Sequence, residues 1–170
     1  MHADDQNSRR SFLRLLGTGA AAVAVSGADI AGQSSTGANS PRTIVSEGLG
    51  RVVIMSFPRG AKLREGIRDK LKELGIPNGV LISAIGTLDK ARFHRITTTG
   101  PKAQSEVLVV EGPIEFSSVE CIVADGEPHL HFTFQDMNRA YSVHLEDEST
   151  VLYVAEVVVA EIKGVQKIRG

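Results

Sequence analysis

The sequence predicts an α+β fold in which one helix is followed by a mostly antiparallel sheet. One observation is an amphipathic segment at residues 62–74, where leucine or isoleucine recurs every three or four positions from Leu63 to Leu74. A second is that nearly all of the chain after Gly79 consists of apolar or β-branched stretches separated by turn signals. Because helices and strands do not alternate, a parallel sheet built from βαβ units is not expected.

Length and composition fit one globular domain with residues to spare. The chain has 170 residues, of which 42% are hydrophobic and 23% are charged, and this excludes a disordered polypeptide. A single cysteine, Cys121, excludes a disulfide-stapled scaffold, and its apolar neighbours favour a buried, unreactive thiol. The net charge of −1 provides no basic field of the kind that attracts nucleic acid.

The N-terminus has the layout of an export signal. Residues 8–14 read SRRSFLR, and a weakly apolar run (15–25) and the small residues 26–28 follow. The paired arginines resemble those of the twin-arginine export signal. We therefore expect residues 1–28 to be a twin-arginine-type signal peptide and the mature protein to be periplasmic. The alternative is a cytosolic N-terminal helix that happens to carry two arginines.

The apolar run of this signal is too short and too rich in glycine and alanine to span a bilayer, so no stable membrane insertion is expected after cleavage. Residues 29–42 lack periodicity and are rich in Gly, Ser and Ala, which predicts a flexible linker. Residues 43–170 are left as the folded domain. Removal of residues 1–28 takes away three arginines and two aspartates, which leaves 16 basic and 18 acidic side chains and a net charge of −2.

The folded part begins with a strand and the helix. Residues 51–57 are apolar and β-prone, and Pro58-Arg59-Gly60 ends this strand in a turn. The positions between the apolar residues of the helix are mostly charged, which we interpret as a solvated face. Gly75 suits the left-handed position that follows a helix, and Pro77 prevents the helix from continuing.

The remaining elements are expected to be strands. Residues 79–86 form an apolar run, and a bend near residues 88–89 separates it from the segment 90–99. Gly112-Pro113 is expected to break the next stretch, and residues 125–128 form a turn. The strands after residue 100 are then 105–110, 114–124, 129–135, 140–145 and 151–162.

Three of the five histidines converge if residues 129–145 form a hairpin. A polar turn at residues 136–139 places His131 opposite His144, with Cβ atoms about 4.5–5.5 Å apart. His129 lies two residues before His131 and therefore on the same face. A slip of one residue in the turn would move His144 to the other face.

Three imidazoles on one face are a typical set of metal ligands. Zinc binds neutral imidazole at about 2.0–2.1 Å, and three protein ligands leave a fourth position open. Other divalent metals that bind imidazole fit the same ligands. The register also places Glu146 opposite His129, as a fourth ligand, a base for a bound water or an orienting group. The simpler interpretation of Glu146 is an exposed carboxylate before a turn.

Other candidates are weaker. His94 lies in a basic strand segment and is interpreted as a structural or surface residue. Ser117 and Ser118 have no base at hand, and Arg92 and Arg95 point to opposite faces of one strand. The sequence contains no nucleophile elbow, phosphate-binding loop or dinucleotide fingerprint.

Four blocks within residues 51–162 resemble the PPC domain, a family conserved in plants and prokaryotes. They are PRG (58–60) with a helix ending in LGI (74–76), ISAIGTL (82–88), EVLVVEGPI (106–114), and PHLH (128–131) with HL (144–145). The last block is the most specific.

This resemblance implies one or two helices on a strongly bent antiparallel sheet, a homotrimer, and in bacterial members a metal ion, zinc, on three histidines. Those histidines correspond to His129, His131 and His144. The family's glycine pair before the third histidine is Ser142-Val143 here, which predicts a narrower pocket or a different ligand. Plant relatives bind DNA through an appended AT-hook, and this sequence contains no such segment.

Three functions follow as hypotheses. The first is an exported, trimeric, metal-binding module that takes a small-molecule ligand at the metal. The second is a metal-dependent hydrolase or lyase, in which the metal lowers the pKa of a bound water to about 7 and Glu146 is the candidate catalytic base. The third is a DNA-binding protein, against which the expected export signal and the net charge of −2 of the mature chain both argue.

Overall fold

The computed structural model describes residues 41–169 of the chain. The predicted signal peptide, residues 1–28, and nearly all of the predicted linker, 29–42, lie outside this range. Among the described residues, no helix is both long enough and apolar enough to cross a membrane.

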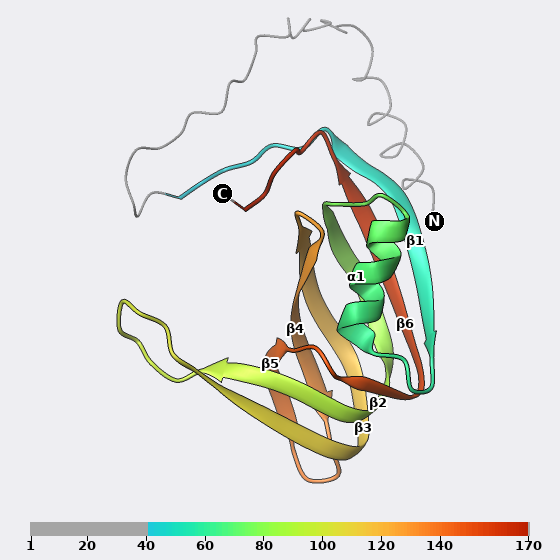
Figure 1. Ribbon diagram of the computed structural model, residues 1–170, viewed down its shortest axis with the longest axis vertical. Helices are drawn as coiled ribbons and strands as arrows, with labels where there is room; N and C mark the ends of the chain where they lie inside the picture. Colours follow the sequence, from blue (N-terminus) through green and yellow to red (C-terminus); the bar gives the residue numbers. More distant parts are fainter. Residues whose placement is uncertain (1–40, 170) are drawn as a thin grey trace, which may run out of the picture. The chain divides into compact units, whose positions relative to one another are not determined.

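Residues 41–169 form one helix and a six-stranded antiparallel sheet (Figure 1), in agreement with the α+β prediction. The strands follow the order β1-β6-β2-β3-β4-β5 across the sheet. In chain order the elements are β1 (Gly48–Pro58), α1 (Leu63–Glu73), β2 (Gly79–Ile96), β3 (Ser105–Ala124), β4 (Glu127–Gln135), β5 (Ala140–Leu145) and β6 (Thr150–Lys163).

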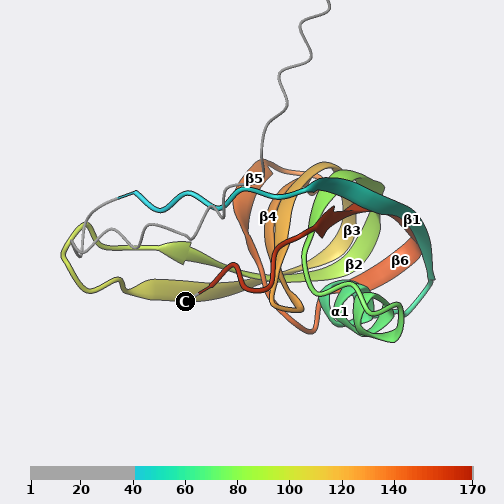
Figure 2. The same ribbon diagram turned by 90° about the horizontal axis from the view of Figure 1, so that it is seen from above.

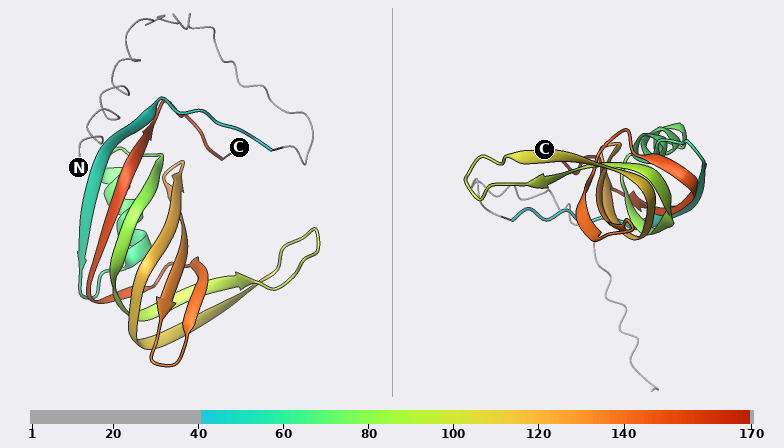
Figure 3. Two further views of the ribbon diagram at one scale, coloured as in Figure 1. Left: turned by 180° about the vertical axis from the view of Figure 1, so that it is seen from behind. Right: turned by 90° about the horizontal axis from the view of Figure 1, so that it is seen from below.

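The sheet bends until its last strand meets the second. β5 pairs with β4 along its length and also with β2, where Phe93 lies opposite Leu145 and His94 opposite His144. Strands β2, β3, β4 and β5 therefore close into a small ring, and β6 and β1 extend the sheet from β2 (Figure 2). The same curl is visible from behind and from below (Figure 3).

Strict alternation along β4 separates the core from the outer surface. Leu130, Phe132 and Phe134 are almost fully buried, whereas His129 and His131 are exposed. The buried rings pack against the other strands of the ring, for example Phe93 of β2 against Phe134 at 5.5 Å in an edge-to-face arrangement. Burial of these aromatic side chains thus forces the histidines of β4 onto the outer face.

Helix α1 covers the inner side of the sheet near β1, β4 and β6 (Figure 1). Three members of its predicted apolar stripe, Leu63, Ile67 and Leu71, are buried, whereas the fourth, Leu74, follows the last helical residue and is 38% exposed. The helix ends at Glu73, and Gly75, two residues further on, has a φ of +65°, the left-handed conformation that glycine adopts without strain. The N–H of Ile76 then donates to the Leu71 carbonyl at 2.9 Å.

The strand breaks predicted near residues 88–89 and at Gly112-Pro113 are wrong. β2 and β3 run through these positions as continuous strands of 18 and 20 residues. Asp89 of β2 stands opposite the two residues Gly112 and Pro113 of β3, between regular pairs on either side. This β-bulge accommodates a proline that cannot donate to the ladder, and it bends the sheet without ending either strand.

Candidate metal centre

The β4–β5 hairpin has the register that its turn predicts. Gln135 pairs with Ala140, and His131 therefore pairs with His144. The Asp136 carboxylate accepts hydrogen bonds from the backbone N–H groups of Asn138 (2.6 Å) and Arg139 (2.8 Å). These bonds hold the pKa of Asp136 below its usual value. They also stabilise the turn at residues 136–139, which sets the register of the hairpin.

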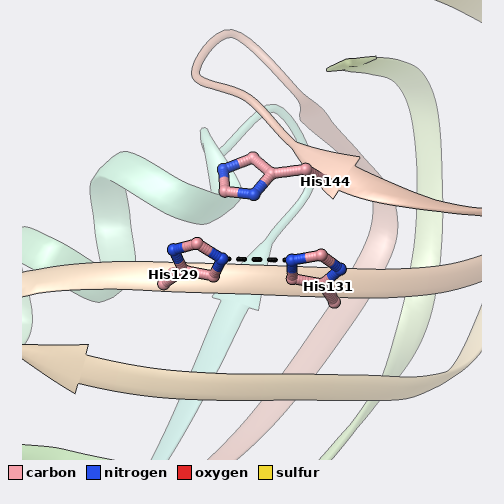
Figure 4. Close-up of side chains that lie close together, drawn as sticks. All are labelled: His129, His131 and His144. Atoms are coloured by element: carbon pink, nitrogen blue, oxygen red, sulfur yellow. Dashed lines mark hydrogen bonds between the residues drawn. The ribbon is translucent and has the colours of Figure 1, made fainter. Parts of the chain in front are cut away.

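The three predicted histidines meet on the outer face of this hairpin (Figure 4). The Nε2 atoms of His129 and His131 are 3.0 Å apart. The His144 ring lies across from both, with ring centroids 4.6 Å from His129 and 5.3 Å from His131. One ring nitrogen from each of the three lies within 4.8 Å of the others.

The surroundings favour neutral imidazoles, the form that binds metals. Burial, followed by the nearby His94 and His129 rings, lowers the pKa of His144 to about 4. Burial and the neighbouring His131 likewise lower the pKa of His129 below its usual value. Near pH 7 both rings therefore offer lone pairs without first losing a proton.

The donor set fits a zinc ion. Ligand nitrogens that share a tetrahedral zinc at about 2.0–2.1 Å lie about 3.3 Å from one another. The 3.0 Å between the Nε2 atoms of His129 and His131 is close to this value, and a ring nitrogen of His144 on the adjacent strand lies within 4.8 Å of both rings' donor atoms. The same donors suit other divalent metals that prefer imidazole.

His94 also belongs to this cluster, although no local pattern in the sequence indicates it. Ring closure places His94 opposite His144, where the two rings stack with centroids 4.4 Å apart and an interplanar angle of 28°. Nδ1 of His94 is 2.5 Å from Oε1 of Glu146. His94, His144 and Glu146 form a second group of close donor atoms. The interpretation of His94 as structural or surface therefore missed its place beside a predicted ligand.

The predicted position of Glu146 opposite His129 is wrong. β5 ends at Leu145, and the backbone N–H of Glu146 donates to the Arg92 carbonyl on β2 at 2.8 Å. The chain thus turns toward β2, and the Glu146 carboxylate reaches His94 instead of His129. Of the roles considered for Glu146, this position suits an orienting group that holds a histidine beside the metal ligands.

A cavity of about 690 Å³ lies beside His129 and His131 and is bordered by β2, β3, β4 and the C-terminal segment. Ser142 and Val143, which were expected to narrow a pocket, do not line it. Val143 packs against the core instead. Cys121 is buried as predicted, and burial raises the pKa of its thiol to about 11.

Residues 45–163 match the family model described as the Plants and Prokaryotes Conserved (PCC) domain. The chain belongs to this family. It is the family that the four sequence blocks resemble, there abbreviated PPC. No curated protein matches this PCC-domain chain.

Several solved structures share the fold of this PCC-domain protein. A plant- and prokaryote-conserved protein from Pyrococcus horikoshii is 25% identical, with a TM-score of 0.59 over 72% of this chain and 87% of that one. A metal-containing protein from Archaeoglobus fulgidus is 24% identical, with a TM-score of 0.58 over the same shares. A Bacteroides thetaiotaomicron protein, described as a candidate DNA-binding protein, is 18% identical, with a TM-score of 0.57 over 71% and 85%.

Proposed function

We propose that this PCC-domain protein is an exported, homotrimeric binding module that holds a zinc ion on His129, His131 and His144. The observation that carries the proposal is the convergence of three imidazole nitrogens within 4.8 Å on one outer face. When bound, such an ion supplies a Lewis-acid centre with an open position for a donor atom of a ligand. The similar fold of an archaeal protein described as metal-containing supports the proposal.

The residues around the three ligands have defined tasks in this account. The buried aromatic side chains of β4 hold His129 and His131 outward, because rotation of the strand would expose Phe132. The stacked His94 ring, held by Glu146, restricts the orientation of His144. The Glu146 carboxylate contacts His94, and this favours an orienting role for Glu146 over the role of a catalytic base. Because the hydrolase or lyase hypothesis uses Glu146 as its base, the contact favours a binding module.

Exposed apolar side chains support self-association. Val52 and Ile54 on β1 are 59% and 76% exposed. Ile96 at the end of β2 and Val107 near the start of β3 are 58% and 50% exposed. Surfaces of this kind commonly pack against another chain. Light scattering during size-exclusion chromatography should give the mass of a trimer, and Ile54→Lys should lower it. A monomer at all concentrations would contradict the trimer.

Export is proposed from the twin-arginine pattern at residues 8–14. Residues 1–42 fused to a reporter should carry it to the periplasm, and changing both Arg9 and Arg10 to lysine should leave it in the cytoplasm. Equal export of both fusions would contradict this part of the proposal.

Metal analysis of the purified full chain tests the central part. We expect about one zinc ion per chain in the wild type and loss of most of it in His131→Ala. Thr133→Ala is the matched control, because Thr133 is the next outward-facing residue of β4 and lies beyond the three ligands. If wild type and His131→Ala retain equal amounts of metal, the proposed site is wrong.

A further inference from the structure

The cavity beside His129 and His131 is lined by both polar and apolar side chains. Its volume of about 690 Å³ is in the range of small-molecule sites, which is about 300–1,000 Å³. His129 and His131 line it on one side, and Ile82 of β2 and Ile122 of β3 line it on another. The cavity therefore adjoins the proposed metal position and also contains apolar wall.

The C-terminal segment forms a further wall, and hydrogen bonds to the exposed side chain of Asp125 and the buried side chain of Asn78 hold it in place. The Asp125 carboxylate accepts the backbone N–H groups of Ile168 and Arg169, each at 2.9 Å. The side chain of Asn78, which is 1% exposed, donates to the Val165 carbonyl at 2.8 Å and accepts the Asp125 N–H at 3.0 Å. Specific hydrogen bonds thus position Arg169 at the cavity.

The charges at the histidine side of the cavity favour an anion. Arg169 lines the same cavity as His129 and His131, so its guanidinium adds positive charge beside them. Glu120 also lines the cavity and opposes it. A dication on three neutral imidazoles together with Arg169 would outweigh that single carboxylate, leaving a net positive end.

The two isoleucines that line the apolar side of the cavity are more than half exposed to solvent. Ile82 is 57% exposed and Ile122 is 54% exposed, and both belong to neighbouring strands of the sheet. An apolar group that covers them would gain free energy in proportion to the area it buries. A ligand with one charged end and one apolar end therefore matches both surfaces.

We propose that this cavity binds a small carboxylate with an apolar body. The carboxylate lies at the end lined by His129, His131 and Arg169, and the body covers Ile82 and Ile122. The inference rests on the proposed metal site, because the ion supplies most of the positive charge at that end. It goes beyond that site by naming the chemical class of the ligand.

Calorimetric titration of the zinc-loaded full chain with butanoate, hexanoate and octanoate tests the proposal. Affinity should rise about threefold to fourfold for each added methylene that is buried. Hexan-1-ol and hexylammonium should bind at least about tenfold more weakly than hexanoate, since they lack the negative charge. No detectable binding, or equal binding of all three hexyl compounds, would overturn the proposal.

Two variants assign the contacts. Arg169→Gln should weaken hexanoate binding about tenfold, whereas Lys167→Gln, a basic residue of the same segment that does not line the cavity, should not. Ile122→Ser should flatten the dependence on chain length. If Arg169→Gln and Lys167→Gln behave alike, the proposed contact is wrong.

Metal content separates this proposal from the proposed function. Both Arg169→Gln and Ile122→Ser should keep the zinc of the wild type, because neither residue is among the three ligands. A wild type that binds zinc but not the carboxylates overturns the ligand class alone. A wild type that binds no zinc overturns the metal site.

Discussion

His94 on β2 lies directly opposite His144 on β5, and their rings stack with centroids 4.4 Å apart. The contact exists because the sheet bends far enough for β5 to pair with β2 as well as with β4. It connects the hairpin that carries the three proposed metal ligands to the long strand β2. The Glu146 carboxylate lies 2.5 Å from Nδ1 of His94 and holds this ring in place against His144.

Removal of the His94 ring, or of the Glu146 carboxylate that contacts it, should weaken metal binding without abolishing it. Outer groups of this kind typically contribute about 10-fold to 100-fold to metal affinity. We expect losses in that range for His94→Ala and Glu146→Gln, measured by competition with a zinc chelator of known affinity.

Glu148→Gln provides the matched control for this comparison, because Glu148 is an exposed carboxylate two residues further along. The zinc affinity of this variant should equal that of the wild type. A Glu146→Gln variant that keeps wild-type affinity would show that the contact with His94 does not support the site.

The metal-free protein should lose stability in mildly acidic solution. The pKa of His144 is about 4 in the folded chain against 6.5 for an ordinary histidine, and the pKa of His129 is also lowered. Between these values the unfolded chain binds more protons, so the free energy of unfolding falls as pH drops from about 6.5 toward 4.

Thermal melts of the metal-free chain from pH 7.5 to pH 4 measure this effect. His144→Asn should show a smaller decrease over the same range, because it lacks the group with the larger shift. An identical pH profile for wild type and variant would show that His144 does not have a lowered pKa.

Gly86 should not tolerate a side chain. Its φ is +154°, and a Cβ atom there would lie 2.5 Å from the Val154 carbonyl oxygen and 2.6 Å from the Ala155 Cα, both of which are backbone atoms of β6. We expect Gly86→Ala to lower the free energy of unfolding in urea by about 2 kcal/mol or more. Gly100→Ala, where a Cβ meets nothing within 4 Å, should change it by less than about 0.5 kcal/mol. Equal stabilities of the two variants would contradict the close approach of β2 and β6.

The aromatic core of the ring should be the main source of its stability. Phe93 is 1% exposed and contacts the rings of Phe134 and Tyr141. Truncation of a buried Phe typically costs about 3–5 kcal/mol, and we expect Phe93→Ala to fall in this range in urea unfolding. Met137→Ala, at a loop position 83% exposed, should cost less than about 1 kcal/mol. A small effect of Phe93→Ala would show that the ring does not close around this side chain.

Local signals in the sequence were sufficient for the helix and for the metal-ligand hairpin. The α1 stripe follows from a spacing of three and four residues, and the pairing of His131 with His144 follows from the length of the turn at 136–139. Both depend on residues that are close together in the chain. Alternation along β4 was equally readable, because every second residue is apolar.

The features that were missed depend on contacts between distant residues. His94 reaches His144 only because β2 pairs with a strand about fifty positions later, and no local pattern indicates that pairing. The same closure draws Glu146 away from His129. Pro113 suggested a break, but β3 has one residue more than β2 at this point and accommodates the proline in a β-bulge.

X-ray absorption spectroscopy at the zinc edge of the metal-loaded chain identifies the atoms that ligate the metal. We expect a first shell with three nitrogen atoms at about 2.0–2.1 Å and the outer-shell scattering typical of imidazole. His131→Ala should lose one of these imidazoles or the metal altogether. A first shell of oxygen or sulfur atoms without imidazole scattering would contradict the site on His129, His131 and His144.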